Sequence, residues 1–271
     1  MVVLLLSLTT LPSLGQGLEN IVVEKYYIAD VMDASDSLSQ GLKNGSVTYR
    51  IWVDMEEGYK LLSIYGAPGN ELVISTSTTF FNDTLNGKIK APDIDHLKLG
   101  KNPLLIDSYI AFSGANRRHL AVYKEDDTDG SILERSGKYQ GGLVERGMLM
   151  AADPEAGKAI RDVDGLMGGG VPALITFGHD FEELGNTLEA SEIRLDNAAW
   201  AVASGLQGPY PEKNYILIAQ ITTDGELSFE LNLQLRSPDE ETEYYVARNP
   251  EGREYTHPAL IFPQPDQSTI K

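Results

Sequence analysis

The chain contains no cysteine, and this absence excludes several kinds of chemistry at once. Disulfide bonds, thiolate metal sites and thiol nucleophiles all require cysteine. Only four histidines occur, and no two of them have the HxH or HxxxH spacing that is typical of zinc and copper sites. The chain also lacks a GxSxG elbow, a P-loop and a GxGxxG motif after a strand, so no nucleophile or phosphate-binding signature is present.

Basic residues are scarce: 22 Lys and Arg stand against 40 Asp and Glu, which gives a net charge of −18. Such a chain repels nucleic-acid phosphates and anionic lipid headgroups, so a nucleic-acid partner is not expected. It attracts divalent cations or basic partners, or the acids serve solubility alone.

Long hydrophobic runs are missing beyond the first residues, and we expect no membrane span. Residues 1–15, MVVLLLSLTTLPSLG, combine a short apolar core with small residues at Ser13 and Gly15, as in a secretory signal peptide. The mature chain would begin at Gln16, and the protein would be secreted, either extracellular or at the cell surface. No basic residue precedes the apolar run, so a buried N-terminal strand is the alternative.

The most regular stretch is YILIAQITTDGELSFELNLQL, residues 215–235. Apolar and polar residues alternate from Glu226 to Leu235, which predicts a strand with one dry and one wet face. Asp224-Gly225 between two such runs predicts a tight type I′ hairpin. The other segments that we expect to be strands are 18–30, 46–55, 59–65, 71–81, 104–113, 172–178, 198–205, 244–247 and 259–262.

Many short strands with Gly/Pro turns and no amphipathic helix predict an all-β fold, an antiparallel β-sandwich that is jelly-roll-like. Residues 116–171 have no such pattern and predict long irregular middle loops. We expect one domain over residues 16–271. A faint echo between residues 58–80 and 214–235 leaves open two lobes, 16–150 and 171–271.

Several of these phrases resemble a family: GLENIVVEKYYIAD, GSVTYRIWVDMEEGYKLLSIYG, NELVISTSTTFFND, the 215–235 stretch and YYVARNP. They are similar to a group of uncharacterised secreted β-rich proteins of Bacteroidota-type bacteria. The resemblance covers most of the mature chain and implies export, but it implies no activity and no functional residues. Many members carry a C-terminal sorting domain, which we do not expect here because the chain stops nine residues after Phe262.

The best metal-ligand pattern is EDDTDGSI at residues 125–132. Glu125, Asp127 and Asp129 alternate before Gly130, as in the first part of an EF-hand-type loop, so Ca²⁺ is the expected ion. Ser136 stands where the last, bidentate Glu belongs, and a solvated Asp-Gly turn is the alternative.

Two further sites are weaker. Trp52 lies on the face of its strand opposite Tyr49 and Ile51, where an exposed ring would stack on a glycan. The alternative is that both faces are covered and Trp52 is core. His179 and Asp180, followed by Glu182 and Glu183, could do acid–base work in a hydrolase, or form only a polar loop.

Together these features predict a secreted, non-catalytic protein with a structural, adhesive or matrix role. It would self-associate as a homo-oligomer and be stabilised by calcium. A glycan-binding module is the first alternative, and a hydrolase with acids in the middle loops is the second.

Overall fold

The structure is a computed structural model that describes residues 17–94 apart from 36, 38 and 40, and residues 104–113, 173–184, 190–208 and 214–263. Within these residues the protein is an all-β, sandwich-like fold of three sheets, which are antiparallel apart from the short β12–β13 pair. The predicted fold class is confirmed. Each segment that was expected to be a strand contains or overlaps an observed one.

The first sheet has the order β1-β2-β9-β5, with bounds Leu18–Ile28, Val47–Met55, Asn214–Thr223 and Tyr109–Ser113. The second has the order β14-β10-β4-β7, with bounds Ile261–Phe262, Leu227–Glu230, Leu72–Thr76 and Glu192–Leu195. The third has the order β13-β12-β11-β3-β8-β6, with bounds Glu254–Tyr255, Thr242–Tyr245, Leu233–Arg236, Lys60–Gly66, Ala198–Leu206 and Leu174–Phe177. Short helices connect them: α1 (Val31–Ser35), α2 (Asp180–Glu183), η1 (Ala91–Asp93), η3 (Leu104–Ile106) and η6 (Pro258–Leu260).

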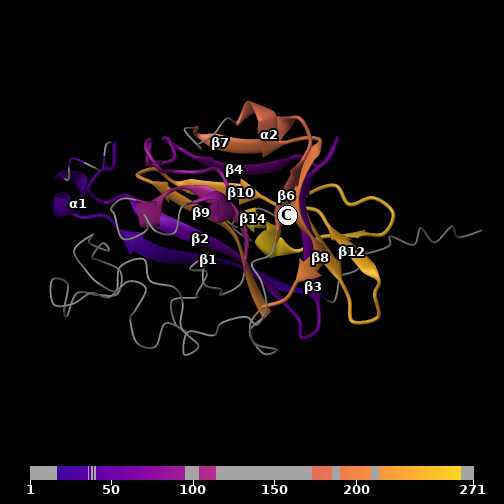
Figure 1. The fold of residues 1–271 in the computed structure, drawn as a ribbon. Helices are drawn as coiled ribbons and strands as arrows, with labels where there is room; N and C mark the ends of the chain where they lie inside the picture. The colour runs from indigo at the N-terminus through magenta and orange to yellow at the C-terminus, as the bar shows by residue number, and fades with distance from the viewer. Residues whose placement is uncertain are drawn as a thin grey trace, which may run out of the picture.

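The three sheets enclose one hydrophobic core. In Figure 1, β7, β4 and β10 lie above β9, β2 and β1, while β3, β8 and β12 lie to the right. The core takes Ile51 and Ile218 from the first sheet, Ile74 from the second, and Leu61 and Trp200 from the third, all fully buried. Burial of this continuous apolar volume is the main force that holds the layers together.

The second and third sheets are joined because three neighbouring strands run from one into the other. β3 continues into β4, β7 into β8, and β10 into β11, and each break occurs at the same level of the ladder. At this level Gly66 is in close contact with the backbone of Leu195, since a Cβ on Gly66 would lie 1.9 Å from the Leu195 carbonyl oxygen. The two sheets therefore act as one sheet with a sharp bend.

The predicted hairpin at Asp224-Gly225 is wrong. β9 pairs with β2 and β5, whereas β10 pairs with β4 and β14, so the turn carries the chain from one layer to the other. Neither turn residue has positive φ, which a type I′ turn would require. Glycine at position 225 lets the turn approach the side chains of Thr76 and Thr78. A Cβ there would lie 2.6 Å from the hydroxyl oxygens of both residues.

The predicted strand from 226 to 235 is split into β10 and β11 by Leu231 and Asn232. Asn232 was expected on the wet face, yet it is 1% exposed. Its Nδ2 donates to the carbonyl oxygens of Tyr65 (3.2 Å) and Asn70 (2.8 Å), and its Oδ1 accepts the Ala247 N–H at 3.0 Å. This one amide satisfies backbone groups that the bend removes from the ladder.

The two-lobe alternative is wrong for the described strands, because each of the three sheets contains strands from both halves of the chain. The two similar stretches, 58–80 and 214–235, also occupy different positions in the fold, since β3 lies in the third sheet and β9 in the first. It reflects the general alternation of strands rather than a duplicated unit.

The alternation of β2 is confirmed, but its polar face is not wet. Thr48, Arg50 and Trp52 are each at most 1% exposed. The Arg50 guanidinium lies 3.5 Å from the ring centroid of Tyr26, and its Nε donates to Gln220 Oε1 at 3.0 Å. At β2 the first sheet therefore buries both of its faces, one apolar and one that mixes polar with aromatic side chains.

Among the described residues, no helix is long and apolar enough to cross a membrane. The predicted signal peptide, residues 1–15, lies outside the described residues. The described chain begins at Gly17, where the backbone N–H donates to Glu243 Oε2 at 3.2 Å and to Tyr245 Oη at 3.0 Å.

Candidate binding groove

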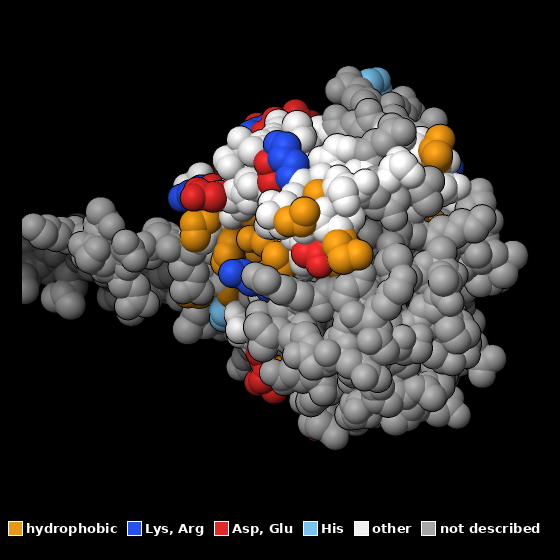
Figure 2. Space-filling model, turned by 90° about the vertical axis from the view of Figure 1, so that its left-hand side faces the viewer, with side chains coloured by type: hydrophobic (Ala, Val, Ile, Leu, Met, Phe, Trp, Pro, Cys, Tyr) orange, Lys and Arg blue, Asp and Glu red, His pale blue; other side chains and the backbone are white. Residues whose placement is uncertain are grey.

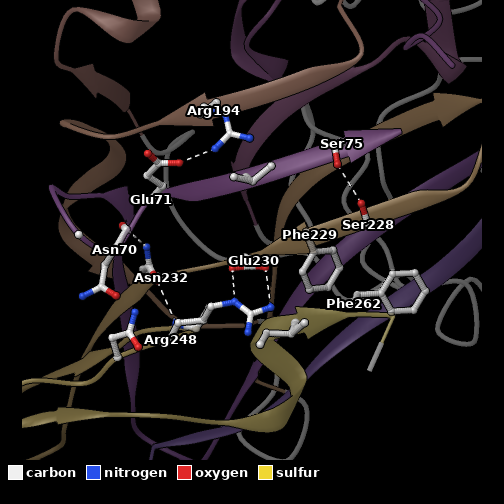
Figure 3. Close-up of a pocket in the computed structure, with 15 residues that line it drawn as sticks. Asn70, Glu71, Ser75, Arg194, Ser228, Phe229, Glu230, Asn232, Arg248 and Phe262 are labelled. Carbon is white, nitrogen blue, oxygen red and sulfur yellow. Dashed lines mark hydrogen bonds and ion pairs between the residues drawn. The ribbon is translucent and has the colours of Figure 1, made fainter. Parts of the chain in front are cut away.

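A groove of about 440 Å³ lies on the outer face of the second sheet, next to its bend into the third. Figure 3 shows Arg194 and Glu71 on one side of β4, and Glu230 with Arg248 on the other. The volume falls within the range of about 300–1,000 Å³ that is common for small-ligand sites. The groove is lined by Gly69, Asn70, Glu71, Val73, Ser75, Arg194, Ser228, Phe229, Glu230, Asn232, Ala247, Arg248, Asn249, Ile261 and Phe262.

The floor of the groove consists of the outward-facing residues of β4 and β10. Leu72 and Ile74 point into the core, so Val73 and Ser75 point outward. Ser228 is the register partner of Ser75, and the two hydroxyls share a hydrogen bond of 2.8 Å. Strand alternation thus places a polar floor directly above the apolar core.

Arg248 and Glu230 form a two-pronged ion pair at one side of the groove. Nε of Arg248 lies 2.7 Å from Glu230 Oε2, and Nη2 lies 2.8 Å from Oε1. The hydrogen bonds from Arg248 lower the pKa of Glu230 below its ordinary value, so the carboxylate stays ionised. This parallel geometry fixes the orientation of both planar groups.

Arg194 on β7 forms the matching pair on the other side. Its guanidinium contacts Glu71 and also lies 3.3 Å from Glu192. Hydrogen bonds to Glu192 and then to Glu71 raise the pKa of Arg194 above its ordinary value. Two exposed cations are therefore held in place by carboxylates at the two sides of the floor.

Two apolar side chains adjoin these charged pairs. Val73 and Ile261 are the register partners of Glu230 on its two sides, so they lie with it on the outer face of the sheet. Phe262 is instead the partner of the buried Phe229, and the two rings stack on the core face, with centroids 5.4 Å apart and planes at 21°. The groove therefore combines fixed donors and fixed acceptors with a small aliphatic surface.

Another hollow, of about 250 Å³, lies near Lys43 and Asp224, at the end that carries the loops. Figure 2 faces this end and shows hydrophobic side chains interspersed with charged ones. Among the described residues, Val31, Met32 and Leu85 are the most exposed large hydrophobic side chains, at 66%, 65% and 78%. Singly exposed apolar residues are common on monomeric proteins, so they define no site.

The structure corrects the proposal for Trp52. Its ring is 1% exposed, and its indole N–H donates to Glu24 Oε2 at 3.0 Å. It packs with Tyr109 and Leu217, as the alternative of a covered face predicted. Stacking on a glycan needs an exposed ring, so Trp52 is a core residue.

The predicted calcium ligands Glu125, Asp127 and Asp129 lie outside the described residues. Within the part of the chain that the structure describes, no group of three or more acidic or histidine side chains could hold a metal ion. Calcium binding at residues 125–132 stays a prediction.

The His179–Asp180 pair has a structural contact. Asp180 Oδ2 accepts the backbone N–H groups of Asp196 (2.9 Å) and Asn197 (3.3 Å), and so holds the turn between β7 and β8. His179 is exposed at the start of α2. Asp180 thus has a role in the fold that does not require catalysis.

Sequence reasoning missed the groove. Glu230 and Ser228 were assigned to the wet face of a strand, which is where they lie, but their partners Arg248 and Ser75 come from the segment after β12 and from β4. Arg194 and Arg248 are basic residues in a strongly acidic chain, and this scarcity is the only local signal that could have singled them out.

Acidic residues lie close together where β1 begins beside the end of β2. Burial, and then the neighbouring Glu19 and Glu56, raise the pKa of Asp54 to about 7. Because this value lies above the unfolded value of 3.8, the folded state binds the extra proton. The resulting stabilisation is complete below about pH 4 and is lost as the pH rises through 7.

We therefore expect Asp54→Asn to raise the free energy of unfolding at pH 8.5 by about 1 kcal/mol, after allowance for solvent screening, and to change it little at pH 5. Urea unfolding of the wild type and the variant at both pH values measures this difference. Glu57→Gln, a change at an exposed acid in the adjacent turn, is the control. An equal effect of Asp54→Asn at the two pH values would contradict the assignment.

Comparison of the chain with protein-family models, with curated proteins and with solved structures gives no match.

Proposed function

We propose that this is a secreted, non-catalytic adhesion protein that holds an extracellular ligand in the groove over β4 and β10. The observation that carries the proposal is the groove itself, in which Arg194 and Arg248 are oriented by carboxylates on a rigid sheet. Exposed ion pairs contribute only about 0–1 kcal/mol to stability, so their arrangement is better explained by recognition than by folding. Export is supported by the leader-like pattern of residues 1–15 and by the family resemblance.

A glycan-binding module is the form of this function that the groove favours, because its floor presents hydroxyl, guanidinium and carboxylate groups close together. Self-association as a homo-oligomer and stabilisation by calcium remain parts of the proposal. A hydrolase is the weaker alternative, because Asp180 is occupied by backbone N–H groups.

The test is retention of the mature chain, residues 16–271, on solid extracellular materials. Cellulose, chitin, xylan, mucin and collagen surfaces are incubated with the purified protein, and bound protein is measured after washing. We expect retention on at least one surface, and loss of most of it in Arg248→Gln and Arg194→Gln. Release of soluble sugars or peptides from any surface would contradict a non-catalytic role, and absence of retention on all of them would contradict adhesion.

A further inference from the structure

The third sheet ends on β6, a short apolar strand. Within the described residues β6 pairs with β8 alone, so no other described strand lies along its second side, which we call the open edge. The backbone groups of an edge strand are a template for pairing with another chain, and native proteins protect such edges with charges, bulges or covering segments.

The other described edge strands of four or more residues have this protection. β1 is interrupted by two shifts of register against β2. β7 carries the charged residues Glu192 and Arg194. In β5 the N–H of Ile110 donates to the carbonyl oxygen of Ile89 at 2.8 Å, so a neighbouring segment covers that edge. Each of these three edges therefore resists the addition of a further strand.

In contrast, β6 carries neither charge nor bulge. Neither β6 nor β8 contains a charged residue, although the chain has a net charge of −18. Strand alternation turns Leu174 into the core and directs Ile175 and Phe177 outward, where they are 38% and 55% exposed. Their register partners on β8 are the small residues Ala201 and Ala199. An uncharged, apolar surface therefore extends across the outer face of the sheet as far as the open edge.

The chain that follows β6 turns away from the open edge. Gly178 has a φ of +95°, and a Cβ on it would lie 2.3 Å from the carbonyl oxygen of Asn197, so the backbone passes close to the start of β8. Asp180 then accepts the backbone N–H groups of Asp196 and Asn197. These contacts tie α2 to the turn between β7 and β8, on the side of β6 that faces β8.

The sequence of β6 is complementary to itself when two copies run antiparallel about a two-fold axis at Thr176. Ile175 then stands opposite the second copy's Phe177, and Phe177 opposite the second copy's Ile175. Because opposite residues share a face of the sheet, the four apolar side chains come together on its outer face. A second copy is also strongly acidic, and two such chains repel each other least where neither carries charge. A contact of this kind uses the same surface on both copies and closes at two.

We propose that two copies of the chain pair through the open edge of β6, so that the third sheet continues from one copy into the other with Thr176 at the two-fold axis. This inference rests on the self-association included in the proposed function, and it names the surface that forms the contact. It requires nothing of the groove over β4 and β10.

The first experiment is analytical ultracentrifugation of the mature chain, residues 16–271. We expect a dimer whose dissociation constant falls when NaCl rises from about 0.05 M to about 0.5 M, because salt screens the repulsion between two acidic chains. A monomer at every protein concentration up to about 0.1 mM would overturn the proposal.

Charged substitutions test the surface. Ile175→Glu and Phe177→Glu should each weaken dimerisation by about tenfold or more, because pairing would bring a carboxylate against an apolar side chain. Both side chains are exposed in the single copy, so circular dichroism should show a folded protein. Tyr244→Glu, at a residue that is 40% exposed on β12 of the same sheet, is the matched control and should dimerise as the wild type does. Unchanged dimerisation in both β6 variants would overturn the proposal.

Engineered cysteines test the register, and the chain has none of its own to interfere. A mixture of Ile175→Cys and Phe177→Cys chains should form disulfide-linked dimers on oxidation, because opposite residues of an antiparallel pair have Cβ atoms about 4.5–5.5 Å apart. Either variant alone should cross-link much less, because its two cysteines would be diagonal neighbours about 7–8 Å apart. Equal cross-linking in the mixture and in the separate variants would overturn the pairing about Thr176.

The two proposals fail in different ways. A monomer that is retained on solid extracellular materials would overturn the pairing through β6 and leave the adhesive function in place. A dimer with the expected cross-links that is retained on none of these materials would support the pairing and contradict adhesion.

Discussion

Gly66→Ala is expected to lower the free energy of unfolding by about 4 kcal/mol or more, and the melting temperature by about 10 °C or more. The reason is the contact between two backbones at the bend of the sheet. The new Cβ would lie 1.9 Å from the carbonyl oxygen of Leu195 and 2.4 Å from its carbonyl carbon. Neither atom belongs to a flexible side chain, so relief requires the β7–β8 strand to move away from β3. Urea or thermal unfolding followed by circular dichroism measures the loss.

Gly69, three residues further on, provides the control. It has a φ of +89°, and nothing lies within 4 Å of the position of its Cβ. Gly69→Ala should therefore cost only about 1 kcal/mol, the usual penalty for an L-residue in a left-handed conformation. Equal losses for the two variants would show that the bend tolerates separation of the strands. Because Gly69 and Asn70 line the groove, Gly66→Ala should also impair retention on solid surfaces.

Arg50→Ala is expected to cost about 3–5 kcal/mol, the range found when one partner of a buried charged network is removed. Arg50 is 1% exposed, and it lies 3.5 Å from the centroid of the Tyr26 ring. Burial alone would lower its pKa, but Tyr26, Tyr109 and Glu24 outweigh burial and raise it, so the cation is stabilised in place. Its removal leaves a cavity and takes a donor from Gln220 Oε1, which also accepts the Tyr109 hydroxyl at 3.1 Å.

Arg236→Ala is the comparison for Arg50→Ala. Its partner Glu240 lies at 3.4 Å on the exposed surface, and such pairs contribute about 0.2–1 kcal/mol. Chemical unfolding of both variants at one pH gives the difference in free energy. A loss below about 1 kcal/mol for Arg50→Ala would mean that water reaches the polar face of the first sheet and replaces the guanidinium.

The strands could be predicted because their signal is local. Alternation over Val47–Met55 reflects which side chains of one strand share a face, and no information from distant residues is needed. Sequence order alone also pairs β1 with β2, since these consecutive strands are antiparallel neighbours.

The hairpin could not be predicted correctly for a physical reason. Asp224-Gly225 is compatible with a type I′ turn between paired strands. It is equally compatible with the observed turn between layers, in which Gly225 lies against Thr76 and Thr78. The choice between the two turns depends on whether pairing of β10 with β9, or with β4 and β14, gives the lower free energy. That difference comes from contacts between residues that are far apart in the sequence.

The sequence alone determined that this protein is an all-β sandwich, because the period of two in hydrophobicity decides which side of each strand avoids water. It also determined that disulfide and thiolate chemistry have no place here, because the atoms are absent. Only the tertiary structure decided that Trp52 and Arg50 are buried. The face of β2 that carries them is covered by segments from elsewhere in the chain, and the sequence of β2 does not reveal these. It alone brought Arg194 to Glu71 and Arg248 to Glu230, since strand register and the bend at Gly66 set these distances between residues remote in the chain.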